Sequence, residues 1–199
     1  MRSVGVRFIL ASASPRRREL LREAGYDFDV VEPNLDEALE DGDPEKLVVR
    51  NALMKARAVA ERFPDRYVLG ADTIVYLQGR VIGKPADRED ARRILKLLSG
   101  TEHQVVTGVA LVRKDAGIEL TGAARTRLRM KTLSAKEVES YVARGEGLGK
   151  AGAYAIQENG DKFIEELRGS FTNVVGLPLE VVETLFREIH RPAGENPAF

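Results

Sequence analysis

Hydrophobic positions fall into short runs that alternate with longer stretches of helical periodicity. The short apolar runs predict buried strands, and they are Arg7–Ala11, Phe28–Val31, Val105–Val112, Ile118–Met130 and Phe163–Leu167. The run Tyr67–Leu77 predicts a strand pair or one bent strand. Gln78-Gly79, which follows it, predicts a hairpin turn.

Helix start signals lie between these runs. Ser14-Pro15 and Asp43-Pro44 each combine an N-cap residue with proline at the first helical position, and Ser134-x-x-Glu137 is a capping box. The predicted helices run from Pro15 to Gly25, from Asp43 to near Arg62, from Asp87 to Ser99, from Ser134 to about Ala143 and over Pro178–His190. Gly145–Gly152 predicts a loop, and residues 191–199 predict a frayed tail.

This order of elements predicts an α/β fold with a mixed sheet. Helices and strands alternate in the first half, which is typical of α/β proteins. Two long strands follow one another directly in the middle of the chain, which argues against a purely parallel, doubly wound sheet. No internal repeat and no linker divides the sequence.

Composition narrows the chemistry. The 199 residues include 31 Lys+Arg and 31 Asp+Glu, so no net charge draws the chain to nucleic acid or to an anionic membrane. The absence of Cys excludes disulfides, thiolate metal sites and cysteine nucleophiles, and the two His residues cannot form a three-His metal site. No apolar run approaches the ~20 residues that span a bilayer, and no signal peptide is evident, so we expect a cytoplasmic location.

The segment Ser12–Leu21 is a candidate anion site. A strand ends, a turn follows, and a helix begins with three arginines in its first turn, where the helix dipole favours negative charge. The exposed amides of that turn, together with Arg16 and Arg17, suit a phosphate group. The alternative is that the arginines are solvated or paired with Glu19 and Glu23.

Two acidic positions are candidate metal ligands. Asp72 lies in the apolar segment Gly70–Val75, where a carboxylate is costly to bury unless it meets a metal, a cation or a substrate proton. Carboxylate oxygens suit hard cations such as Mg²⁺ or Mn²⁺. Glu37, in the pair Asp36-Glu37, would complete an oxygen-rich site beside Asp72. Each position also has an alternative without a metal: backbone amides of a turn could hold Asp72, and Asp36-Glu37 could simply be a solvated acidic loop.

Two lysines gain meaning only if they converge on the arginines. Lys55 lies one helical turn after Asn51, and Lys84 precedes Pro85 just after the predicted hairpin. Either could be an ordinary surface residue.

The string Gly147–Gly152 fits GxGxxG but follows a helix rather than a strand, so it does not predict a dinucleotide site. A Ser–His–Asp triad is improbable with only His103 and His190 available.

Eight motifs in order resemble the Maf family of nucleoside triphosphate pyrophosphatases. They are SASPRRRELL, LDE at Leu35–Glu37, MKAR at Met54–Arg57, GADTIV, GKP at Gly83–Pro85, LSGTEHQVVTGVAL, GKAGAYAIQ and GSFTNVVGLPL. The resemblance runs from about Phe8 to Phe186. It implies an inosine-triphosphate-pyrophosphatase-like fold, with an elongated mixed sheet and a cleft between two lobes. It also implies one catalytic domain over residues 1–190, with 191–199 as a tail.

The resemblance also implies roles for particular residues. Asp72 matches the catalytic acid-base position, and Arg16, Thr73 and Gln157 match positions tied to substrate choice. The positions that match phosphate- or metal-binding residues are Arg17, Glu37, Lys55 and Lys84, with Glu37 and Asp72 as the metal pair and Ser12 as a further substrate-binding residue. The implied cofactor is a divalent cation, Mg²⁺ or Mn²⁺, and a homodimer is an expectation of the same resemblance.

The implied reaction is hydrolysis of a nucleoside triphosphate to the monophosphate and pyrophosphate. The segment Ala153–Gln157 is similar to the sequences of the branch of the family that acts on dTTP and UTP. Two alternatives stay open: a pyrophosphatase for another or modified nucleotide, such as 7-methylguanosine triphosphate, and a non-catalytic regulator of cell division that senses nucleotides.

Overall fold

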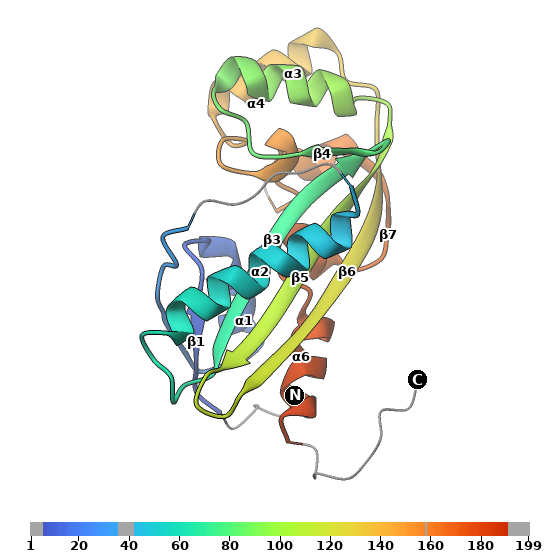
Figure 1. Cartoon of the computed structure of the whole chain (residues 1–199). Helices are drawn as coiled ribbons and strands as arrows, with labels where there is room; N and C mark the ends of the chain where they lie inside the picture. The colour runs from blue at the N-terminus through green and yellow to red at the C-terminus, as the bar shows by residue number, and fades with distance from the viewer. Residues whose placement is uncertain (1–5, 36–41, 158, 191–199) are drawn as a thin grey trace.

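The computed structural model describes residues 6–35, 42–157 and 159–190. Figure 1 shows an elongated molecule in which long strands run between two ends. The strands are β1 (Phe8–Ala11), β2 (Phe28–Val30), β3 (Val68–Leu77), β4 (Arg80–Ile82), β5 (Glu102–Arg113), β6 (Ile118–Met130) and β7 (Ile164–Arg168). The helices are α1 (Pro15–Glu23), α2 (Pro44–Ala60), α3 (Arg88–Leu98), α4 (Ala135–Arg144), α5 (Phe171–Val175) and α6 (Leu179–Glu188), with short 3₁₀ turns at Ala151–Ala153 and Asn159–Phe163.

The seven strands form one mixed sheet, as predicted. Its order is β2-β1-β3-β5-β6-β7, and β4 pairs with β3. β1 is parallel to both β2 and β3, whereas β3, β5, β6 and β7 pair antiparallel. β3, β5 and β6 are the long strands that connect the end carrying α3 and α4 to the end carrying β1 and α6 (Figure 1).

One edge of β3 is open over four residues. β1 pairs with β3 as far as Ala11 opposite Gly70, and β4 begins to pair only at Val75 opposite Ile82. Within the described residues, positions 71–74 therefore have β5 on one side and no strand on the other. Such a gap leaves backbone groups for other partners, and the candidate site lies there.

Side chains along β3 alternate between two cores, as the period of a strand requires. Val68 packs with α2 in one core, while Leu69 and Ala71 pack with α1 and α6 in another. Continuing the alternation, Asp72 faces α2 and Thr73 faces α1 and α5. The strand thus presents two polar residues on opposite faces at the point where its edge is open.

Two glycines let α2 lie very close to the sheet. A Cβ on Gly70 would lie 2.3 Å from the Ala52 carbonyl oxygen, and one on Gly108 would lie 2.4 Å from the Val48 carbonyl oxygen. Both obstacles are helix backbone, which cannot move alone. The close approach matters because α2 carries Lys55, whose side chain must reach Asp72 on β3.

We therefore expect Gly108→Ala to destabilise the protein by about 1–3 kcal/mol, because the added methyl overpacks the contact between α2 and β5. The thermal unfolding midpoint measures the effect. Gly122→Ala is the matched control: it lies on the neighbouring strand, opposite Val109, and its new methyl would meet the side chains of Val181 and Leu185 rather than helix backbone. Equal midpoints for the two variants would show that the backbone contact does not limit packing.

The structure decides one prediction that left two alternatives, and it differs from the predictions at two local features. Tyr67–Leu77 was open between a strand pair and a bent strand, and it forms the single strand β3, with β4 completing the predicted hairpin. Ser14 precedes α1, but in the described structure its hydroxyl makes no capping hydrogen bond. The helix α5 was not predicted.

No helix among the described residues combines the length and the apolar character needed to cross a membrane. The organisation of residues 1–190 as one two-lobed domain stays a prediction, and the predicted tail, 191–199, lies outside the described residues.

Candidate active site

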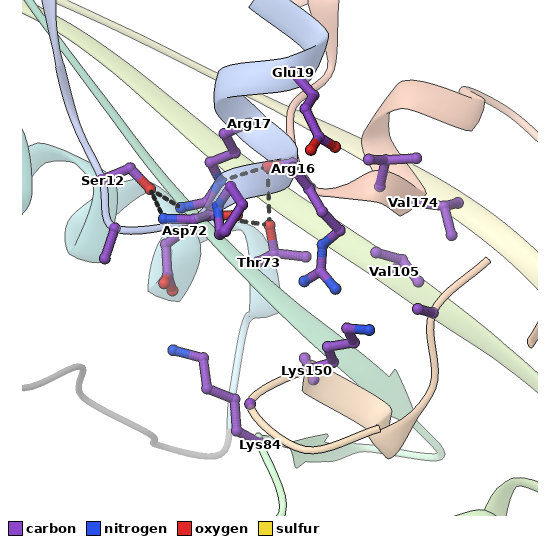
Figure 2. Close-up of a pocket in the computed structure, with 18 of the residues that line it drawn as sticks. Ser12, Arg16, Arg17, Glu19, Asp72, Thr73, Lys84, Val105, Lys150 and Val174 are labelled. Carbon is purple, nitrogen blue, oxygen red and sulfur yellow. Dashed lines mark hydrogen bonds between the residues drawn. The ribbon is translucent and has the colours of Figure 1, made fainter. Parts of the chain in front are cut away.

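A cavity of about 890 Å³ lies at the open edge of β3. Eight of the nine predicted site residues line it: Ser12, Arg16, Arg17, Lys55, Asp72, Thr73, Lys84 and Gln157. The ninth, Glu37, lies outside the described residues. Figure 2 shows Arg16 and Asp72 on one side of the cavity and Lys84 and Lys150 on the other. These eight residues, which are distant in sequence, therefore meet at one cavity, and the roles predicted for them stay predictions.

Asp72 is buried and held by two side chains of α2. Its Oδ1 accepts a hydrogen bond from Lys55 Nζ at 2.7 Å, and its Oδ2 accepts one from Asn51 Nδ2 at 2.9 Å. Asn51 and Lys55 share a helix face because they are four residues apart. The carboxylate is thus neither solvated nor bound to turn amides: a paired cation and an amide fix its plane at the cavity wall.

Arg17 lines the cavity and connects several segments of the protein through its guanidinium. Its Nε donates to the Gly176 carbonyl at 2.7 Å. Its Nη1 donates to the Ala71 carbonyl at 2.9 Å and to Ser12 Oγ at 3.2 Å, and its Nη2 donates to Thr73 Oγ1 at 3.0 Å (Figure 2). The Ala71 carbonyl belongs to the open stretch of β3, so Arg17 takes the place of a missing strand. One guanidinium therefore joins the turn after β1, the strand β3 and the end of α5.

Thr73 is part of a buried polar chain rather than a free hydroxyl. Its Oγ1 lies 3.0 Å from Thr107 Oγ1 and 3.3 Å from the Gly176 carbonyl. Thr107 in turn donates to the Asn173 carbonyl at 3.3 Å. The Asn173 side chain donates to the Val105 carbonyl and to Thr126 Oγ1. This chain fixes α5, and with it the Gly176 carbonyl that accepts from Arg17.

The cavity favours anions. Its described lining carries five cationic side chains, Arg16, Arg17, Lys55, Lys84 and Lys150, and three carboxylates, Glu19, Glu32 and Asp72. The first turn of α1 begins at Pro15 in the wall, with no acidic residue in that turn. The positive end of the helix dipole and the adjacent backbone amides add to the attraction.

Three residues of the site were not among the predicted set. Asn51 lies one helical turn before Lys55, and this spacing could have indicated that the two side chains bind the same partner, Asp72. Lys150 lines the cavity and belongs to the predicted glycine-rich loop. Glu146 and Lys150 are the two charged residues of that loop, so the lysine could have been identified as a candidate from the sequence. The Gly176 carbonyl could not be found by residue type, because backbone acceptors have no sequence signature.

The described residues fit a cation that is shared with a ligand, not a closed metal cage. No group of three or more His, Asp or Glu side chains gathers in the described ranges. Among the described lining residues, Asp72 is the one buried carboxylate beside the cationic side chains. Mg²⁺ is commonly held by one or two carboxylates plus substrate phosphates, so this donor set is compatible with it.

Solved structures that share this fold include two Ham1 proteins. A HAM1 protein from Coxiella burnetii has a TM-score of 0.52 and 17% sequence identity, covering 93% of this chain and 98% of that chain. The Staphylococcus aureus Ham1 protein has a TM-score of 0.50 and 15% identity, covering 92% and 98%. The predicted fold class is confirmed: this is an α/β protein with a HAM1-like fold, and cationic side chains outnumber carboxylates in the described lining of its cavity.

The sequence comparisons place the chain more narrowly. The family model described as "Maf-like protein" matches residues 7–189, so the chain belongs to the Maf family. A dTTP/UTP pyrophosphatase of Geotalea uraniireducens (strain Rf4) is 50% identical over 90% of this chain and 93% of its own length. Proteins of the same name from Symbiobacterium thermophilum (52%, covering 86% and 88%) and Anaeromyxobacter dehalogenans strain 2CP-C (50%, covering 94% and 95%) are similarly close.

Proposed function

We propose that this chain is a nucleoside triphosphate pyrophosphatase that hydrolyses dTTP and UTP to the monophosphate and pyrophosphate. The observation that carries the proposal is the meeting of a buried carboxylate, Asp72, with five cationic side chains in one cavity. The identity of about 50% to proteins named dTTP/UTP pyrophosphatase supports the same substrates.

The cations bind the polyphosphate chain. Arg16, Lys84 and Lys150 lie around the cavity, where they can approach the phosphate oxygens from more than one side. Charge-assisted hydrogen bonds of this kind contribute ~1.5–3 kcal/mol each. They also stabilise the charge that builds on pyrophosphate as it leaves. The backbone amides at the start of α1 extend the same grip.

Asp72 orients and deprotonates the attacking water. The water oxygen forms a bond to the α-phosphorus, the bond from that phosphorus to the bridging oxygen breaks, and pyrophosphate leaves with the electron pair. Asp72 accepts the proton that the water loses. Its plane is fixed by Lys55 and Asn51, so the carboxylate is aimed before substrate arrives.

A divalent cation, Mg²⁺ or Mn²⁺, would be held by Asp72 and Glu37 together with the substrate phosphates. When bound, such a cation lowers the pKa of a coordinated water and neutralises phosphate charge. Lys55 then has two functions for this chain: it neutralises part of the Asp72 charge in the free protein, and it adds a positive charge near the phosphates. A homodimer and a cytoplasmic location stay predictions.

Base choice rests on Gln157 at the cavity wall, and Arg16, which also matches a position tied to substrate choice, is assigned here to the phosphates. A side-chain amide offers both a donor and an acceptor, which matches the edge of uracil or thymine. A site built around such hydrogen bonds rejects an unmatched base strongly. The hydroxyl of Thr73 already bonds to Arg17, Thr107 and Gly176, so we assign it an indirect role through the position of Arg17.

The test is pyrophosphate release from dTTP, UTP, CTP, ATP, GTP and 7-methylguanosine triphosphate, each with Mg²⁺ and with Mn²⁺. We expect dTTP and UTP to have the highest kcat/KM. A preference for 7-methylguanosine triphosphate would keep the reaction and overturn the base assignment. Tight binding of triphosphates without any release of pyrophosphate would instead identify a nucleotide sensor.

A further inference from the structure

The segment that carries Gln157 follows a backbone kink at Gly152 and Ala153. Gly152 and Ala153 both have left-handed conformations, with φ of +74° and +58°. Alanine is uncommon in this region, and holding it there costs free energy. Residues 154–157, which follow, line the cavity. A strained kink that persists must be held in place by its surroundings.

Two tyrosines hold this segment from different sides. Tyr154 OH lies 2.8 Å from Nε2 of His103 on β5, and the two rings meet edge to face. The backbone N–H of Ala155 donates to the hydroxyl of Tyr141 on α4 at 3.0 Å. The relative exposures of His103, Tyr154 and Tyr141 are 1%, 5% and 0%. These bonds fix Tyr154 and Ala155, which follow the kink at Gly152 and Ala153 and precede Gln157.

The chemistry proposed above does not use His103. Burial lowers the pKa of its imidazole to about 4, so the ring is neutral throughout the physiological range. Burial also raises the pKa of the Tyr154 phenol, which therefore keeps its proton. A neutral pair serves poorly as an acid-base relay at neutral pH. It serves well as a permanent hydrogen bond whose strength does not change with pH.

The base-reading and phosphate-binding parts of the cavity come from different elements. Gln157 belongs to the segment held by the tyrosines, whereas Arg16, Lys55 and Asp72 belong to α1, α2 and β3. Gln157 is exposed, so its own backbone must be held if its amide is to select one base edge. Loosening residues 154–157 should thus affect the base and leave the phosphates bound as before.

We propose that the bond between His103 and Tyr154 is a specificity-determining device that positions Gln157 against the base of dTTP or UTP. The proposal rests on the function assigned above and deepens it. His103 and Tyr154 are positioning residues: they act on the substrate through the backbone of residues 154–157 and not through contact with the reacting atoms.

Tyr154→Phe tests the proposal, because it removes one hydroxyl and keeps the ring. We expect KM for dTTP and UTP to rise about 5- to 10-fold, the equivalent of one hydrogen bond, with kcat changed less than about twofold. The inhibition constant of inorganic tripolyphosphate, which has phosphates and no base, should stay at the wild-type value. Gln157→Ala gives the size of a direct loss, and Tyr26→Phe, whose ring packs on Phe8 and Phe186 away from the cavity, is the matched control.

The double variant His103→Leu/Tyr154→Phe separates positioning from stability. Removing both partners of a buried hydrogen bond costs less than leaving one unpaired, so its unfolding midpoint should exceed that of Tyr154→Phe while KM stays high. Three results would overturn the proposal: an unchanged KM in Tyr154→Phe, a parallel rise in KM and in the tripolyphosphate constant, or a KM that recovers together with stability. A wild-type protein that releases no pyrophosphate from dTTP or UTP would refute the assigned function itself, before any variant is compared.

Discussion

Asp72→Asn is expected to lower kcat for dTTP by about 10³-fold, because the amide keeps the size of the carboxylate and cannot accept a proton from water. Lys55 and Asn51 now bond to the two carboxylate oxygens. In the variant the amide nitrogen must face one of these donors, so the geometry is weakened as well as the basicity. Steady-state pyrophosphate release measures the loss.

Binding should respond in the opposite direction. Asp72 places a negative charge beside the cationic lining of the cavity, and the substitution removes the repulsion that this charge exerts on a triphosphate. We therefore expect the dissociation constant of tripolyphosphate to fall or to stay the same while turnover collapses. Asp65→Asn, an exposed residue outside the cavity lining, is the control. A variant that keeps more than a tenth of wild-type kcat would remove Asp72 from the role of base.

Where a structural signal is local, the sequence was sufficient. The Asp43 side chain accepts from the first amides of α2, and Ser134 and Glu137 form the predicted capping box of α4. These bonds join residues two or three positions apart, so no tertiary contact decides them. The five-residue helix α5 is different, because a helix this short cannot nucleate alone. The Asn173 side chain fixes it by bonding to Val105 and Thr126, far away in the sequence.

The site follows the same division. Asp72 was identifiable because a carboxylate in an apolar strand needs a partner. Its partner Lys55 lies on the same face of the helix as Asn51, and the four-residue spacing of these two residues is visible in the sequence. The orientation of Arg17 was not identifiable. Three consecutive arginines look alike in sequence, and only the open edge of β3 and the end of α5 distinguish the one that turns inward. The sequence predicted that Arg17 matters, and the structure shows that its hydrogen bonds go to protein acceptors.

That distinction leads to the second large effect, which is expected for Arg17→Lys. Arg17 is 9% exposed, and its planar fork donates to acceptors on three separate segments. A lysine keeps the charge, but its donors share one nitrogen and cannot reach all of them. Buried acceptors that lose a charged donor are left unsatisfied, so we expect a loss of about 3–5 kcal/mol in the free energy of unfolding.

Chemical denaturation of the ligand-free protein measures this loss, and Arg18→Lys is the matched control. Arg18 is the next residue of α1, donates to the Ala13 carbonyl and lies near the exposed Glu32, so its replacement should cost less than about 0.5 kcal/mol. The comparison separates two roles. If Arg17 holds these segments of the protein together, Arg17→Lys is less stable than wild type before any nucleotide is added, because the acceptors belong to the protein. A direct phosphate contact predicts a ligand-free protein as stable as wild type with weakened binding of tripolyphosphate, and that result would contradict the role of holding these segments together.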